Sequence, residues 1–152
     1  MKSVVIKFGL FGLIFSLSLF LTVLYVGMGM DFNTQEVLGY LTILVALSTI
    51  YFGIRHYRDR VNEGKISFLK GLLIGLLITL ITAIGIAIAD FIYTTVINPD
   101  FFDDYARMIR DEGYTGEIPD YGSGFMALIM YLTVLLLGLF VSLLAALFLQ
   151  RR

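Results

Sequence analysis

The chain contains no cysteine, no tryptophan, a single histidine and two prolines. Without cysteine it can form neither a disulfide nor a thiolate metal site. Both prolines, Pro99 and Pro119, lie in one polar segment, so neither interrupts the long apolar stretches. Broken helices, which line many transport sites, are therefore not expected. Because tryptophan is missing, the nine tyrosines and thirteen phenylalanines must supply any aromatic anchoring at a membrane surface.

The signature motifs of several large enzyme classes are also missing. The sequence has no HExxH, no GxSxG and no P-loop pattern. The single histidine, His56, lies among arginines, and no nucleophile–base pair is visible. We therefore assign no catalytic residue, no metal ligand and no cofactor, and we expect a protein that is not an enzyme.

What the chain has in quantity is hydrophobic sequence, with 59% hydrophobic residues and a mean hydropathy of +0.90. Its uncharged cores are Phe8–Met30, Val37–Ile54, Gly71–Ala89 and Phe125–Leu149. Each is near or above the roughly 18–20 residues that a helix needs to cross a bilayer. The sequence predicts an all-α membrane protein: a single domain, 1–152, with four transmembrane helices in an antiparallel bundle. The predicted spans are 8–30, 37–54, 71–97 and 125–149.

Positive charge falls on alternate sides of these stretches. In chain order, the segments outside them carry two, none, five, two and two lysines or arginines, so nine of eleven lie on one side. The positive-inside rule places that side in the cytoplasm. We expect both termini and the inner loop 55–70 in the cytoplasm, and the outer loop 98–124 on the opposite side.

The outer loop is predicted to carry a short amphipathic helix over 99–112. Pro99 suits the first helical position, and aspartates follow in the first turn, where the helix dipole favours acids. Apolar residues recur with the spacing of one helical face. They are Phe101, Phe102, Tyr105, Met108 and Ile109. We expect this helix to lie on the outer membrane surface or on the bundle.

Small residues form ridges along the predicted helices, and such residues let helix backbones approach closely. The second helix has Gly39, Thr42, Ala46, Thr49 and Gly53, and the third has Gly71, Gly75, Thr79, Ala83 and Ala87. The fourth has Gly138, Ser142 and Ala146. We expect the second and third helices to pack through their ridges; the alternative is a homodimer interface.

Asp90 is the one acid inside a predicted span, about two turns from its outer end. A charge at the bilayer centre costs about 2.5–3.5 kcal/mol on insertion scales, and less near the interface. We interpret Asp90 as an interfacial acid that reaches outward or pairs with Arg107 or Arg110. The alternative is an ion or proton site.

The inner loop carries a distinctive pattern. It reads Gly53-Ile54-Arg55-His56-Tyr57-Arg58-Asp59 and then Gly64-Lys65-Ile66-Ser67-Phe68. With Asn98-Pro99-Asp100-Phe101, this pattern resembles a bacterial domain-of-unknown-function family, number 4199. The resemblance implies a small four-helix protein of the bacterial inner membrane and supplies no activity.

The inner loop has two interpretations: a hairpin that fixes the topology, or a docking surface. The candidate docking residues are Arg55, Tyr57, Arg58, Asp59, Gly64 and Phe68. We expect a non-enzymatic accessory or scaffolding subunit that contacts membrane lipids, a membrane-protein partner or further copies of itself, and no nucleic acid. Two alternatives stay open: a small transporter or channel with an oligomeric pathway, and a helper of a lipid-linked sugar enzyme.

Overall fold

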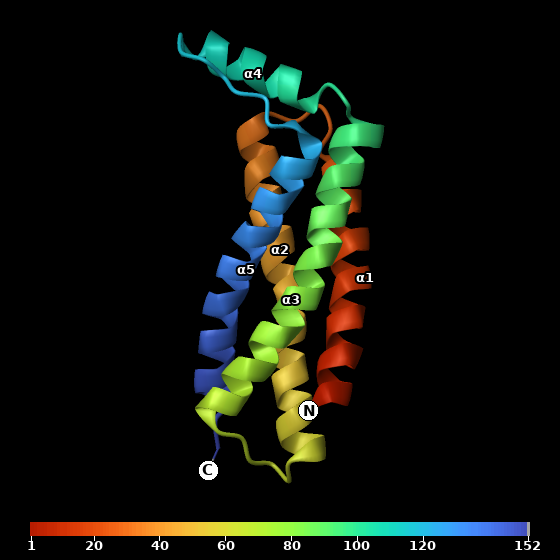
Figure 1. Cartoon of the computed structure of the whole chain (residues 1–152), viewed down its shortest axis with the longest axis vertical. Coiled ribbons are helices and arrows are strands. Elements are labelled where there is room, and N and C mark those ends of the chain that lie inside the picture. The colour runs from red at the N-terminus through yellow and green to blue at the C-terminus, as the bar shows by residue number, and fades with distance from the viewer. Residues whose placement is uncertain (152) are drawn as a thin grey trace.

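The computed structural model describes residues 1–151 and consists of four long helices side by side, with a short fifth helix across one end (Figure 1). The long helices are α1 (Lys2–Val26), α2 (Phe32–His56), α3 (Phe68–Ile92) and α5 (Gly122–Leu149); the short one is α4 (Phe101–Asp111). All four long helices are long and apolar enough to cross a membrane. The expected fold class is confirmed. Arg152, the last residue of the expected domain, lies outside the described residues.

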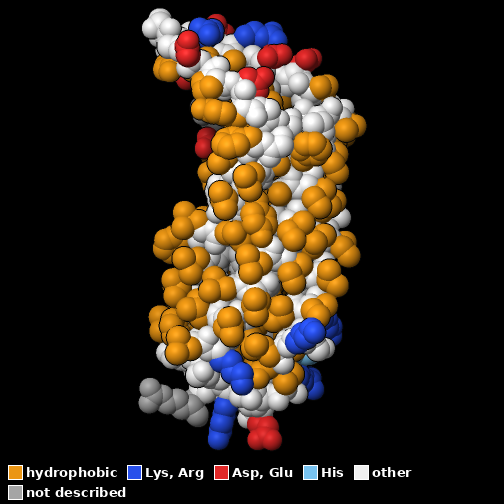
Figure 2. All heavy atoms as spheres, in the orientation of Figure 1, with side chains coloured by type: hydrophobic (Ala, Val, Ile, Leu, Met, Phe, Trp, Pro, Cys, Tyr) orange, Lys and Arg blue, Asp and Glu red, His pale blue; other side chains and the backbone are white. Residues whose placement is uncertain are grey.

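The chain alternates direction, so α1 and α3 run one way and α2 and α5 the other (Figure 1). The loop 62–67 lies at the same end as both chain ends, and we call this the basic end. The opposite end, which carries the turn 27–31, α4 and the segment 112–121, is the acidic end. Figure 2 shows a broad apolar band between these two charged ends. That band is what a multi-pass membrane protein presents to lipid.

The first helix differs from the expected span at both ends. It begins at Lys2 rather than Phe8, because the long lysine side chains can lie in a helix and still reach the surface. It ends at Val26 rather than Met30, because the chain turns at Gly29, which has a φ of +87°. Only glycine adopts that conformation at little cost.

The second and third helices each end in one wide turn of π-helix, which the sequence did not predict. These turns are η1 (Tyr57–Val61) and η2 (Tyr93–Ile97). Each opens with a buried tyrosine and closes on an asparagine. The N–H of Asn62 donates to the carbonyl of Tyr57 at 3.0 Å, and that of Asn98 donates to Tyr93 at 2.7 Å. In both turns the asparagine follows the tyrosine at the same spacing, and this repeated pattern was the sequence signal for the π-helical turns.

The amphipathic helix is confirmed with a later start. Pro99 lies in a turn instead of the first helical position, and α4 begins at Phe101. The turn is held by the N–H of Phe101, which donates to the carbonyl of Asn98 at 3.1 Å.

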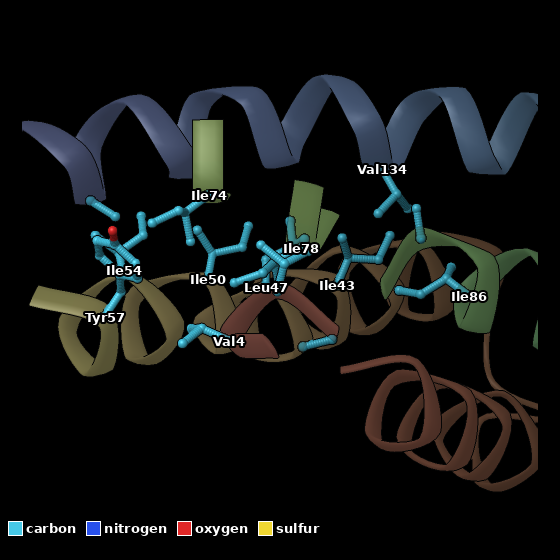
Figure 3. Close-up of a cluster of buried hydrophobic side chains, with 14 of the residues drawn as sticks. Val4, Ile43, Leu47, Ile50, Ile54, Tyr57, Ile74, Ile78, Ile86 and Val134 are labelled. Atoms are coloured by element: carbon cyan, nitrogen blue, oxygen red, sulfur yellow. The ribbon is translucent and has the colours of Figure 1, made fainter. Parts of the chain in front are cut away.

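The core runs along the bundle axis and is built from branched aliphatic side chains (Figure 3). α2 contributes Ile43, Leu47, Ile50 and Ile54, and α3 contributes Ile74, Ile78 and Ile86. α5 adds Val134. The large residues of α2 therefore fill the centre of the bundle between α3 and α5.

Candidate functional site

The tightest contact of α3 in the half near the basic end is with α5. A Cβ placed on Gly71 would lie 3.2 Å from the Cβ of Ala146, and one on Gly75 would lie 2.6 Å from the hydroxyl oxygen of Ser142. A Cβ on Gly138 would collide with Thr79. The two ridges therefore interlock in one antiparallel register, and both step by four residues.

α1 packs on a different face of α3, nearer the acidic end. A Cβ on Gly85 would collide with the backbone carbonyl of Leu13 and the hydroxyl of Ser16. The Ser16 hydroxyl donates to the carbonyl of Thr82 at 3.0 Å, which links the two helices directly. Sequence reasoning missed this contact. The signal was the small row Gly9, Gly12 and Ser16, whose steps of three and four match one helical face.

The ten small residues assigned to packing are all at least partly buried in the bundle. Gly39 and Ala87 are half-buried, and the other eight are buried. Their partners differ from the expected ones, however. The ridge of α3 meets small residues of α5, whereas α2 offers it the side chains of Ile50 and Ile54. On the α2 ridge, the hydroxyl of Thr49 lies 3.0 Å from the Cβ position of Gly12 in α1.

The buried hydroxyl groups of the bundle either donate to backbone carbonyls of their own helix or lie against a glycine of a neighbouring helix. Thr79 and Thr49 donate to backbone carbonyls of their own helices at 2.8 Å and 2.9 Å. Among the described residues, the buried hydroxyls of Thr82 and Ser142 have no hydrogen-bond partner. Each oxygen faces a glycine of a neighbouring helix, Gly12 or Gly75. Such an approach allows weak Cα–H···O contacts, which recur between close helices.

Of the two arrangements expected for Asp90, the ion pair with Arg107 or Arg110 does not form. Its side chain is half-buried near the acidic end of α3, and no salt bridge within residues 1–151 includes it. Arg107 instead pairs with Asp104, at 2.9 Å on the same helix. The reason is geometric: α4 lies across the end of the bundle and turns Arg107 to solvent.

At the basic end, Arg58 fastens the inner loop to the end of α5. The side chain of Arg58 is only 10% exposed. Its Nε and Nη2 donate to the two carboxylate oxygens of Asp59, at 2.6 Å and 3.1 Å. Its Nη1 donates to the carbonyl of Leu149 at 3.3 Å, which satisfies one of the free carbonyls at a helix C-terminus. We call this arrangement the clasp.

The rest of the inner loop reinforces the clasp. Ile66 and Arg151 exchange two backbone hydrogen bonds, at 2.8 Å and 2.9 Å, as in a short antiparallel bridge. Gly64 has a φ of +80°, which glycine tolerates. The side-chain amide of Asn62 donates to the carbonyl of Lys65 at 2.7 Å. The loop is therefore pinned to the chain's C-terminal segment in a defined conformation.

The clasp divides the six candidate docking residues. Tyr57 and Arg58 are buried, while Gly64 and Phe68 are half-buried. The Lys70 ammonium covers the ring of Tyr57 at 5.3 Å from the centroid. Asp59 is occupied by Arg58 and also lies 3.6 Å from Arg55. Arg55 remains exposed, together with Arg60 and Lys65, which the sequence reasoning did not select. The exposed cations, not the buried ones, can contact another molecule.

At the acidic end, aromatic rings hold α4 on the bundle. The ring of Phe101 packs edge-on against Phe32 of α2 and Tyr93 of η2, each at a centroid distance of 5.8 Å. Tyr105 packs against Phe32 at 5.5 Å. The far end of α4 extends beyond the four long helices (Figure 1). The amphipathic helix was expected either on the membrane surface or on the bundle. The start of α4 lies on the bundle.

A groove opens between α3 and α5 near the acidic end. It has a volume of about 330 Å³ and is bounded by Ile84, Ala87, Ile88, Phe91, Ala127, Leu128 and Tyr131. All seven residues are apolar or aromatic, so the groove offers a shape with little polar chemistry.

Comparison with known proteins finds one family that covers nearly the whole chain. The model of the family described as "Protein of unknown function (DUF4199)" matches residues 7–151. No curated protein and no solved structure matches the chain.

Proposed function

We propose that this chain, which belongs to the DUF4199 family of proteins of unknown function, is a non-enzymatic accessory subunit of the bacterial inner membrane. Its basic end docks on an acidic surface of a membrane-protein partner. We further propose that the basic end lies in the cytoplasm, because most lysines and arginines gather there.

The observation that carries this proposal is the clasp. A loop between two helices usually costs conformational entropy when it binds, and a loop that is already fixed avoids that cost. Here Arg58, Ile66 and Asn62 each fix the loop through hydrogen bonds. The exposed side chains of Arg55, Arg60 and Lys65 are therefore carried on a pre-organised backbone.

The partner can be tested by purification in lipid nanodiscs with mass spectrometry of bound proteins. We expect a stoichiometric membrane protein that is retained by the parent chain and lost in the variant Arg60→Glu. Arg110→Glu is the matched control, because it reverses an exposed arginine at the other end. Equal retention in both variants would contradict docking through the basic end.

A second outcome would favour the transporter or channel instead. If the purified chain forms an oligomer that moves ions or solute in liposomes, the accessory role is wrong. Asp90→Asn sharpens this test, since that change should leave an accessory subunit unaffected. Loss of flux in Asp90→Asn would assign the half-buried carboxyl to the pathway. If lipid-linked sugars or an enzyme that processes them co-purify with the chain, the result would instead support a helper of a lipid-linked sugar enzyme.

Orientation can be tested separately, because the chain has no cysteine of its own. Single cysteines at Glu63 and Thr115 lie on exposed segments at opposite ends. We expect a membrane-impermeant thiol reagent to label Thr115→Cys in intact spheroplasts and Glu63→Cys only after lysis. The reverse pattern would invert the proposed topology.

A further inference from the structure

The methionines of this chain gather at the acidic end. Of the six, only Met1 lies at the basic end (Figure 1). The others are Met28 and Met30 in the turn 27–31, Met108 in α4, and Met126 and Met130 in the first turns of α5. Core packing does not require this asymmetry, because branched aliphatic side chains fill the core along its whole length.

Met28 and Met30 lie outside the core. They are 41% and 43% exposed, whereas Met108, Met126 and Met130 are all half-buried. From the sequence alone no metal ligand was expected, because two methionines in an apolar region are equally compatible with a buried position. Their exposure on a turn at the acidic end removes that explanation and leaves two thioethers within reach of solutes.

The backbone of the turn is held by hydrogen bonds on both sides of the pair. The N–H of Met28 donates to the carbonyl of Tyr25 at 3.3 Å, and the N–H of Met30 donates to that of Gly27 at 3.1 Å. The side-chain amide of Gln35 donates to the carbonyl of Met30 at 2.8 Å. Two residues of chain span at most about 7 Å. Because a methionine side chain is long and unbranched, both sulfur atoms can reach one ion while the backbone stays in place.

From this arrangement we infer that Met28 and Met30 form a binding site for a soft monovalent cation, Cu⁺ or its larger analogue Ag⁺. Thioether sulfur is a soft, polarisable ligand that selects Cu⁺ among the biological metals. Mg²⁺ and Ca²⁺ are hard cations that take oxygen ligands instead. The site lies at the opposite end from the proposed docking surface and depends neither on a protein partner nor on the orientation of the chain.

The charges around the turn favour a cation. Asp31 follows Met30 directly, and Glu36 is exposed one turn further along α2. The Asp31 carboxylate accepts hydrogen bonds from the N–H and the hydroxyl of Thr34, at 2.9 Å and 2.7 Å. No lysine or arginine lies between residues 8 and 54 of the sequence. Two neutral sulfur ligands leave the ion with its positive charge, which these carboxylates offset.

The inference is tested by NMR of the full chain in detergent micelles, with the methionine methyl groups labelled with ¹³C. Silver nitrate in chloride-free buffer is the probe, because Ag⁺ needs no reductant. We expect the methyl signals of Met28 and Met30 to shift together and to saturate at one Ag⁺ per chain. Met1 is the internal control: it is 42% exposed, lies at the other end and has no second methionine near it in the sequence. Its signal should not move at the concentration that saturates the pair.

Leucine variants test whether the sulfur atoms are the ligands. Met28→Leu and Met30→Leu conserve the side-chain volume and remove one thioether each. Each should weaken Ag⁺ binding at least as much as the roughly 10–100-fold that loss of an outer-shell partner costs a metal site. Met126→Leu is the matched control and should bind Ag⁺ as the parent does. Circular dichroism of all three variants checks that the bundle remains folded.

Four results would overturn the inference. Equal shifts of all six methyl signals would show only adventitious contact between Ag⁺ and accessible sulfur. A shift of Met28 without Met30 would exclude a shared ion. Unchanged affinity in both leucine variants would mean that the sulfur atoms are not ligands. A stronger response to Mg²⁺ than to Ag⁺ would assign cation binding to the carboxylates of Asp31 and Glu36.

Discussion

The two halves of α3 use glycine for different contacts. Near the basic end, the atoms nearest to the Cβ positions of Gly71 and Gly75 are side-chain atoms of α5, the Cβ of Ala146 at 3.2 Å and the hydroxyl oxygen of Ser142 at 2.6 Å. Nearer the acidic end, Gly85 faces the backbone carbonyl of Leu13 in α1. The Ser142 hydroxyl can change its rotamer to make room, but a helix backbone can move only as a unit. The comparison teaches that equal spacing of small residues does not mean equal tolerance of substitution.

Gly85→Leu is the strongest way to test this comparison. We expect a loss of about 3 kcal/mol or more, at the upper end of overpacking, because the new side chain meets backbone. Gly75→Leu should cost less, about 1–3 kcal/mol, because part of its clash is with the movable Ser142 side chain. Unfolding in sodium dodecyl sulfate, followed by circular dichroism, measures both. Gly124→Ala is the control, since no atom lies within 4 Å of its Cβ position. A larger loss in Gly75→Leu would reverse the comparison.

A cysteine pair fixes the register of the α3–α5 contact. The Cβ position of Gly71 lies 3.2 Å from the Cβ of Ala146, so a slight separation of the two helices brings the pair to the roughly 3.5–4.5 Å of a disulfide. Gly71→Cys with Ala146→Cys should cross-link on mild oxidation and stabilise the chain by about 2–4 kcal/mol. Gel mobility before and after reduction detects the bond. Gly71→Cys with Leu144→Cys should not cross-link, since Leu144 is exposed. A disulfide in that pair would show that α5 is rotated about its axis relative to this structure.

The variant Arg58→Ala tests whether the clasp stabilises the basic end of the bundle. It removes the hydrogen bonds to Asp59 and to the Leu149 carbonyl, and we expect a loss of about 1–3 kcal/mol. Hydrogen exchange should rise at Ile66 and Arg151. Arg58→Lys keeps the charge but cannot form the paired bonds, so it should fall between the parent and alanine. An unchanged exchange rate at Ile66 would mean that the backbone bridge holds the loop alone.

Phe101→Ala tests how the acidic end holds α4. Each aromatic pair is worth about 0.5–1.5 kcal/mol beyond its buried area, and Phe101 contacts both Phe32 and Tyr93. We expect α4 to detach while the four spans remain folded. Limited proteolysis should then cut between 101 and 121 sooner than in the parent. Tyr114→Ala, at an exposed site beyond the helix, is the control, and equal cleavage rates would contradict docking by aromatic contacts.

The smallest expected effect concerns the start of α2. Hydrogen bonds from the Thr34 hydroxyl and N–H hold the pKa of the Asp31 carboxyl below its usual range. A lowered pKa stabilises the folded chain above the unfolded pKa, and that contribution is lost as the pH falls through the folded pKa. Asp31→Ala should lower the melting temperature slightly at pH 7, with a smaller difference at pH 3. Asp31→Asn should retain the cap at both values. A pH-independent difference for Asp31→Ala would exclude the charge as its cause.

The four spans, the amphipathic helix and the packing face of α3 were predictable from the amino-acid sequence alone. These follow from composition and spacing: uncharged runs of sufficient length must lie in lipid, and residues four apart share one side of a helix. It also marked the inner loop as distinctive, although it did not show that Arg58 is buried against Leu149.

The partner that each helix face meets follows from the packing of the whole bundle. A row of residues spaced by four, such as Gly71, Gly75 and Thr79, turns about 40° around the helix at each step, so the partner depends on how the helices cross. The row could have met α2 as easily as α5, since both carry small residues. The clasp and the groove likewise join residues more than forty positions apart, such as Arg58 with Leu149 and Leu80 with Tyr131. No local pattern encodes such pairs, because they form only when the packed helices bring distant segments together.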